Sequence, residues 1–178
     1  MAATLAGWHD LYVTVGAAAA TLVGLLFVGL SLHIRVVVAH REVRSLARVT
    51  LTAFFAVVLV AIAVLQPADS ALMVADWLVA IGVVSLILTV KPLRDGLARR
   101  SGRALGLGTI TARFGVSGLA FAGLLACAGL LAAGRTIDAL NLLLVFVVLL
   151  LVVSVRNTWD LLVTLAASSG EDDLQAGS

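Results

Sequence analysis

A stretch of 22 residues from Tyr12 to His33, YVTVGAAAATLVGLLFVGLSLH, constrains this chain more than any other feature. It carries no charged side chain before its last residue. A helix of this length rises roughly 30 Å, which is the thickness of the hydrocarbon core of a bilayer. We therefore expect a membrane-spanning helix here and an integral membrane protein overall.

The composition supports the same class of protein. Of the 178 residues, 62% are hydrophobic and 12% are charged, whereas soluble domains carry about 25% charged residues. Lipid must cover much of this apolar surface, because one small soluble core cannot hold it. The single cysteine, Cys127, excludes an intramolecular disulfide. Eleven of the twelve basic residues are Arg, which together with abundant Ala, Val, Leu and Gly is typical of GC-rich bacterial genomes. We expect a multi-pass protein of a bacterial plasma membrane.

The predicted fold is all-α, a transmembrane helix bundle that forms one domain over residues 1–167. The five predicted spans cover residues 12–33, 49–65, 71–90, 114–133 and 137–155. Pro67 and Pro92 mark ends of spans, and Gly134 lies in a very short turn between the last two. Residues 156–167 are predicted to form an interfacial segment, and the polar, acidic residues 168–178 to form a disordered tail.

Basic residues predict the orientation. The connections after the first and third predicted spans hold ten of them, the connection after the second holds none, and the one after the fourth holds only Arg135. By the positive-inside rule, the N-terminus lies outside and the C-terminus in the cytoplasm. We expect the basic loops to contact anionic headgroups of the inner leaflet, and we expect no nucleic-acid partner.

Small residues recur every four positions in the first span, at Gly16, Ala20 and Gly24. Such faces let helix backbones approach closely in lipid. One interpretation is ordinary packing within a single subunit. The other is self-association, in which this helix contacts a second copy and lines a pore with Thr21 and Ser31. The fourth span repeats the spacing at Gly118, Ala122 and Ala126.

Asp76 is a carboxylate inside the third predicted span, where a charge costs roughly 3 kcal/mol on insertion scales. One interpretation is that it is hydrated near the membrane surface. The other is an outer polar site that Asp76 forms with Arg135 and Asn141, because the predicted topology places all three at the same membrane face.

A second polar group is predicted at the opposite face, formed by His33, Arg113, Asn157 and Asp160. One interpretation is anchoring at the interface combined with local ion pairing. The other is a gate or a surface that docks a partner protein.

No combination of residues in the sequence indicates catalysis or a cofactor. The three histidines have no metal-ligand spacing, so we expect no metal site. Neither a GxSxG sequence nor a phosphate-binding loop is present. We expect a protein that is not an enzyme.

The opening residues Trp8–Tyr12, the stretch from Gly16 to Ser31, and the late segment Arg156–Leu162 resemble small multi-span membrane proteins of actinobacterial type. The resemblance implies a bacterial origin and a similar topology, and it attaches no function to any residue.

Two functions are compatible with these features. The first is a homo-oligomeric ion channel or small transport protein. The alternative is a non-catalytic accessory or regulatory subunit that binds another membrane protein through its small-residue faces and basic loops.

Overall fold

The computed structural model describes residues 2–39, 41–67, 70–98 and 107–176, with side chains described for 8–35, 37–39, 43–67, 70–90 and 115–163. All secondary structure in these ranges is α-helical. The six helices are α1 (Ala2–Leu32), α2 (Ile34–Ala39), α3 (Arg41–Leu65), α4 (Ala71–Ala98), α5 (Leu107–Ala132) and α6 (Thr136–Ala176).

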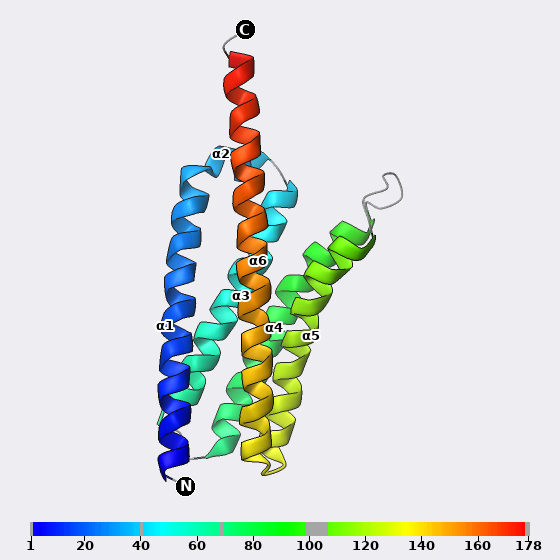
Figure 1. Ribbon diagram of the computed structural model, residues 1–178. Coiled ribbons are helices and arrows are strands. Elements are labelled where there is room, and N and C mark those ends of the chain that lie inside the picture. The colour runs from blue at the N-terminus through cyan, green and yellow to red at the C-terminus, as the bar shows by residue number, and fades with distance from the viewer. Residues whose placement is uncertain (1, 40, 68–69, 99–106, 177–178) are drawn as a thin grey trace.

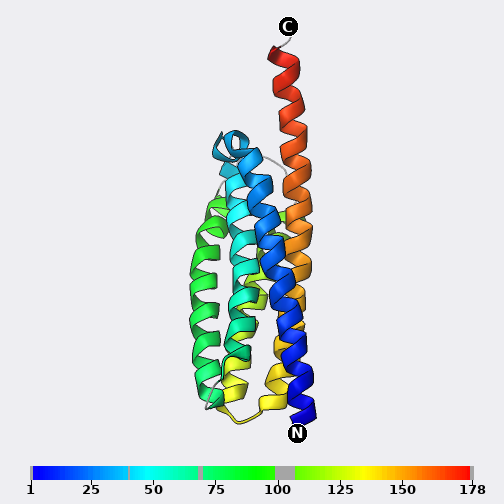
Figure 2. The same cartoon turned by 90° about the vertical axis from the view of Figure 1, so that its left-hand side faces the viewer.

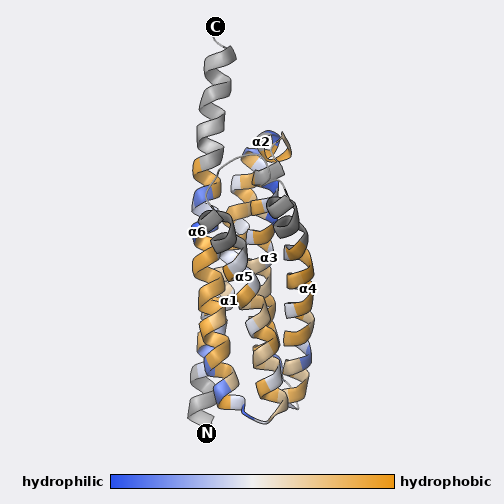
Figure 3. Cartoon of the chain, turned by 90° about the vertical axis from the view of Figure 1, so that its right-hand side faces the viewer, coloured by the Kyte–Doolittle hydropathy of each residue, from blue (hydrophilic) through white to orange (hydrophobic). Residues whose placement is uncertain are grey.

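Five of these helices contain a segment that is long and apolar enough to cross a membrane, which confirms the predicted all-α class and the number of spans. Figure 3 shows apolar residues along most of their length and hydrophilic ones near the two ends of the bundle. The five segments are Trp8–Leu32, Val43–Leu65, Ala71–Val90, Gly115–Ala132 and Thr136–Val163.

Four helices form a closed ring, and α1 packs on it from outside. In the ring, α3 packs on α4, α4 on α5, α5 on α6, and α6 on α3. Helix α1 contacts mainly α3, on a different side from α4 (Figures 1 and 2). As a result α3 is the central helix: 50% of its apolar segment is buried, against 17% for α1.

The two termini lie at opposite ends of the bundle, as an odd number of spans requires (Figure 1). We call one end the turn end, because it holds the α3–α4 and α5–α6 connections, at Leu65–Ala71 and Ala132–Thr136. We call the other the basic end, because it holds Arg35, Arg44 and Arg48. Here the α4–α5 hairpin leans away from α1 and α6 (Figure 1). The turn half and the basic half are the halves of the bundle nearer to each end.

The turn between α5 and α6 has the short form that the sequence predicts. Gly134 adopts a φ of 78°, a backbone conformation that disfavours residues with a Cβ atom. Its N–H donates to the Leu131 carbonyl oxygen at 3.0 Å, and the Arg135 N–H donates to that of Leu130 at 2.9 Å. This pattern satisfies the last carbonyl groups of α5 and reverses the chain within a few residues.

Helices extend further than predicted at the basic end. Helix α3 begins at Arg41, within the predicted connection between the first two spans, and α4 continues through Pro92 to Ala98. Helix α6 is continuous to Ala176 and includes the residues predicted as an interfacial segment and a tail. The physical reason is that extending an existing helix needs no new nucleus, and no proline interrupts residues 156–176.

Candidate functional site

Polar side chains interrupt the buried stripe of α6 in the basic half. The stripe faces the interior of the ring and begins at the turn end with apolar side chains, from Ala139 through Leu143 and Val147 to Leu150. The next two positions are Ser154, which is 0% exposed, and Asn157, which is 3% exposed. The interior of the bundle therefore changes from apolar to polar along one helix face.

The other helices of the ring bury hydroxyl groups at the same level. Thr50, Ser85, Ser117 and Ser154 lie 14–18 residues from the turn-end termini of α3, α4, α5 and α6, and Thr89 and Asn157 follow about one turn further on. We call this set the polar layer: Thr50, Ser85, Thr89, Ser117, Ser154 and Asn157.

Hydrogen bonding within the polar layer is incomplete. The Thr50 hydroxyl donates to the Leu46 carbonyl oxygen at 2.9 Å, and the Thr89 hydroxyl donates to that of Ser85 at 2.8 Å. In contrast, the hydroxyl oxygen of Ser154 is buried without a hydrogen-bond partner. A buried polar atom without a partner costs about 1–3 kcal/mol, so its presence in a lipid-embedded bundle needs a reason.

Ser117 and Ser154 lie at similar depth across the α5–α6 hairpin. The ring of Phe146 packs directly against Gly123, which fixes the antiparallel register of the two helices. In this register, Ser117 and Ser154 are within about one helical turn of each other in depth. The two buried serines thus belong to one level of the ring interior.

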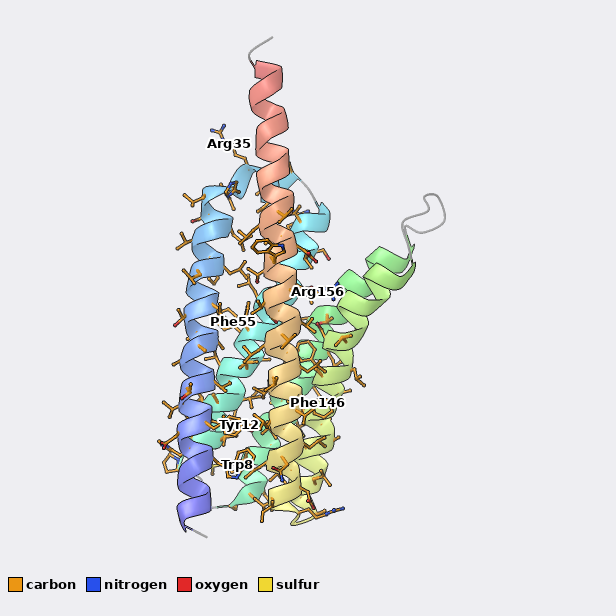
Figure 4. The ribbon with its side chains drawn as sticks, in the orientation of Figure 1. Trp8, Tyr12, Arg35, Phe55, Phe146 and Arg156 are labelled. Carbon is orange, nitrogen blue, oxygen red and sulfur yellow. The ribbon has the colours of Figure 1, made fainter. Side chains whose placement is uncertain are left out.

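The turn half closes the ring with apolar and aromatic side chains. Leu78, Phe121 and Leu143 are each at most 1% exposed and belong to one core cluster. Tyr12 joins this cluster from α1 and stacks on Trp8 with ring centroids 6.2 Å apart (Figure 4). The interior is therefore polar at one level of the basic half and apolar in the turn half.

The small-residue face predicted on α1 is divided between two environments. Gly16 lies against α3, where an added Cβ would come within 2.8 Å of the Ala61 Cβ. Ala20, Thr21 and Gly24 are exposed, and an added Cβ at Gly24 would have no neighbour within 4 Å. Within one chain, therefore, only the first of the three small residues packs closely on another helix.

The hydroxyl groups on the exposed side of α1 bond to their own helix. Thr21 donates to the Ala17 carbonyl oxygen at 2.9 Å, and Ser31 donates to that of Val28 at 2.8 Å. Both are satisfied without water, so their exposure to lipid carries little cost. A pore-lining role for Thr21 and Ser31 stays a prediction.

The three residues of the predicted outer polar site lie at the turn end. Arg135 pairs with Asp138, with a nitrogen–oxygen distance of 2.8 Å, in the first turn of α6. Asp76 lies five residues into α4 and is exposed, and no described side chain forms an ion pair or hydrogen bond with it. Asn141 is also exposed. A shared site of the three stays a prediction.

The predicted inner cluster is only partly visible. The His33 Nδ1 donates to the Gly29 carbonyl oxygen at 3.2 Å, where α1 ends. Asn157 is buried and Asp160 is half-buried on α6. The side chain of Arg113 lies outside the described residues. Asn157 thus belongs to the ring interior rather than to a surface.

Of the polar layer, Asn157 is the residue that the sequence pattern singled out. Single Ser and Thr residues in apolar spans carry no signal of their own, because most of them bond to their own helix. The useful signal is positional: Ser154 and Asn157 continue the i, i+3, i+4 stripe that begins with Ala139 and Leu143.

Among the described side chains, no three His, Cys, Asp or Glu residues gather closely enough to hold a metal ion. Comparison with protein-family models, curated proteins and solved structures found no match for this chain. The resemblance to small actinobacterial membrane proteins stays a prediction.

Proposed function

We propose that this protein is a small, non-catalytic transport protein that moves an ion or a small polar solute across a bacterial plasma membrane. The observation that carries the proposal is the polar layer, with the buried and unpaired Ser154 hydroxyl at its centre. Polar groups inside a membrane bundle are costly, and they commonly mark the path of a substrate.

The chemistry of the layer suits a neutral or singly charged substrate. Hydroxyl and amide groups offer both donors and acceptors, so they can replace part of the water shell of a small ion or solute. The apolar closure around Phe121 and Leu143 would act as a gate that a conformational change opens. Passage through a single chain therefore requires movement of the turn half.

The proposed orientation has the turn end outside and the basic end in the cytoplasm. Four of the five described arginine side chains, those of Arg35, Arg44, Arg48 and Arg156, lie at or near the basic end, and Arg135 is the exception. This asymmetry is the one that the positive-inside rule uses.

Orientation can be tested by cysteine labelling in intact cells. In a Cys127→Ala background, Ser70→Cys should react with a membrane-impermeant maleimide and Arg35→Cys should not. The two positions are exposed at opposite ends of the bundle, so each is the control for the other. Labelling of Arg35→Cys alone would reverse the proposed orientation.

Transport is tested by flux into liposomes that contain the purified protein. Ser154→Val and Asn157→Leu should each lower the flux of salt or glycerol, followed by light scattering, at least tenfold. Val152→Ala is the control, because Val152 is exposed on the same helix. If Thr21→Val and Ser31→Val lower flux while the two interior variants do not, the path lies between subunits instead.

We also propose that the protein self-associates through α1. The exposed positions Ala17, Thr21, Gly24, Val28 and Ser31 form one stripe along this helix. Small residues on a lipid-facing stripe permit close contact with another helix. Native mass spectrometry from nanodiscs should show an oligomer that Gly24→Leu disrupts and the control Ala80→Leu, on the exposed side of α4, does not.

The same uncovered face of α1 favours one alternative, an accessory subunit that binds a different membrane protein. A monomer that co-purifies with one stoichiometric partner would support that function. Asp76→Asn also distinguishes the two functions. It should alter ion selectivity in a transport protein whose outer polar site guides ions. It should leave partner binding intact in an accessory subunit.

A further inference from the structure

A groove opens on the lipid-facing side of α3 and α4, and Ser85 of the polar layer lines its α4 side. The groove has a volume of about 480 Å³, which is within the range of about 300–1,000 Å³ for small-molecule sites. Helix α3 forms its floor, with α4 on one side and Leu30 of α1 and Val37 of α2 on the other. Figure 2 shows α3 between α4 and α1 in this way.

The floor of the groove is a stripe of α3 that is basic at one end and mainly apolar along the rest, where Thr52 is the polar exception. Arg44, Arg48, Leu51, Phe55 and Leu59 follow each other at spacings of three and four residues and all line the groove. Two guanidinium groups therefore stand one helical turn apart at the basic end, and Phe55 lies about midway along the bundle (Figure 4).

The groove is open toward lipid along its apolar part. Phe55 is 46% exposed and Leu59 is 42% exposed on α3, and Leu88 is 46% exposed on α4. With Val84, these side chains border a surface that a hydrocarbon chain can reach from the membrane without passing through the protein.

The two arginines have no acidic partner among the side chains that the structure describes. Within the described part of the chain, neither the Arg44 nor the Arg48 guanidinium pairs with a carboxylate. Like charges four residues apart on a helix repel each other. A phosphate group between them can accept charge-assisted hydrogen bonds from both and removes that repulsion.

The dimensions also fit one leaflet. From Arg48 to Leu59 the helix rises about 16 Å, and one leaflet contributes about half of the roughly 30 Å hydrocarbon core. The geometry points to a binding site for one anionic phospholipid, with its phosphate on Arg44 and Arg48 and an acyl chain along Leu51, Phe55 and Leu59. This site does not depend on the proposed transport, and either one can fail alone.

The test is a lipid titration of the detergent-solubilised full chain, with bound lipids counted by native mass spectrometry. Phosphatidylglycerol should bind at least tenfold more tightly than phosphatidylcholine of the same chain length. Removing both charges in Arg44→Gln/Arg48→Gln should weaken phosphatidylglycerol binding about thirtyfold. The charge-matched control Arg35→Gln/Arg156→Gln removes two arginines outside the groove. This control should change phosphatidylglycerol affinity less than threefold.

A second pair of variants tests the apolar part without changing charge. Leu88→Trp fills the groove and should weaken binding at least fivefold, whereas Ile87→Trp should not, because the exposed side chain of Ile87 does not line the groove. Far-UV circular dichroism checks that all variants keep their helix content.

Three results would overturn the site. Equal weakening in the groove and control double variants would mean general attraction to basic residues. Competition by millimolar inorganic phosphate, with Leu88→Trp unaffected, would mean a headgroup contact without a bound acyl chain. Loss of a protein oligomer in Leu88→Trp, without change in lipid binding, would assign the groove to a second copy of this chain.

Discussion

The turn half and the basic half of the bundle hold their helices together in different ways. In the turn half, helices touch through glycine: added Cβ atoms at Gly16 and Gly123 would collide with Ala61 and Phe146. Toward the basic end, an added Cβ at Gly29 would lie 3.3 Å from the end of the Leu162 side chain, so a smaller displacement would admit it. The polar layer and the open groove both lie in or extend into the basic half.

This difference has a physical origin. Lipid gives helices no hydrophobic reason to associate, so close packing through small residues is a main source of their attraction. Where glycine brings α1 onto α3 and α5 onto α6, the interior is apolar and buried. Where hydroxyls replace apolar side chains at the buried faces, we expect the helices to separate more easily.

The largest expected effect comes from Gly123→Val in the turn half. The ring of Phe146 occupies the space that the new side chain needs, so overpacking should lower the free energy of unfolding by about 3 kcal/mol. The measurement is unfolding in mixed micelles of a mild detergent and dodecyl sulfate. Gly129→Val, on the same helix with open space around it, is the control. Combining Gly123→Val with Phe146→Leu should restore part of the loss, and an unchanged loss would place the strain elsewhere.

A smaller loss is expected for Gly16→Leu, which pushes α1 away from Ala61. The free energy of unfolding should fall by about 2 kcal/mol. The loss is smaller than for Gly123→Val because α1 packs on one side only and can shift outward. Gly24→Leu on the same helix should cost less than about 0.5 kcal/mol in a monomeric preparation. Equal losses from both variants would show that the exposed stripe of α1 also packs within the chain.

Ser154→Ala should not lower the free energy of unfolding, unlike the two glycine variants. Its hydroxyl is buried and unpaired, so removing it should leave stability unchanged or raise it by up to about 1 kcal/mol, while flux falls. Tyr12→Phe is the counterpart in the turn half, since the Tyr12 hydroxyl is also buried without a partner. Tyr12→Phe should raise stability without lowering flux. A stability loss in Ser154→Ala would mean that this hydroxyl is a structural contact.

The smallest effect is expected for Thr89→Val. The Thr89 hydroxyl bonds to the Ser85 carbonyl oxygen of its own helix, so it does not join two helices. The change in unfolding free energy should stay below about 0.6 kcal/mol, an average value for interhelical hydrogen bonds in membranes. A larger loss of unfolding free energy would indicate that Thr89 also holds a neighbouring helix.

Apolar length predicted most of the fold. The third predicted span, residues 71–90, coincides with Ala71–Val90, and the Gly134 turn follows from one residue that tolerates positive φ. The helices extend past the predicted spans at the basic end, because neither Pro92 nor the polar residues after Asn157 interrupt them. Local sequence does not state how far a helix continues beyond the bilayer.

The candidate sites were harder to predict than the spans. The polar layer combines single residues from four helices, and its level becomes visible only when the helices are paired. Asp76 and Arg135 have opposite charges, and yet Arg135 pairs with Asp138, three residues away in its own helix. The groove depends on α1 and α4 packing on different sides of α3, which no local pattern encodes.

The external position of α1 also has an evolutionary consequence. The four-helix ring buries its own interior through contacts among α3, α4, α5 and α6. Mutations on the open face of α1 can therefore be selected for new neighbours without repacking the ring. A chain of this design can diversify its associations on one helix while the other four conserve what lies between them.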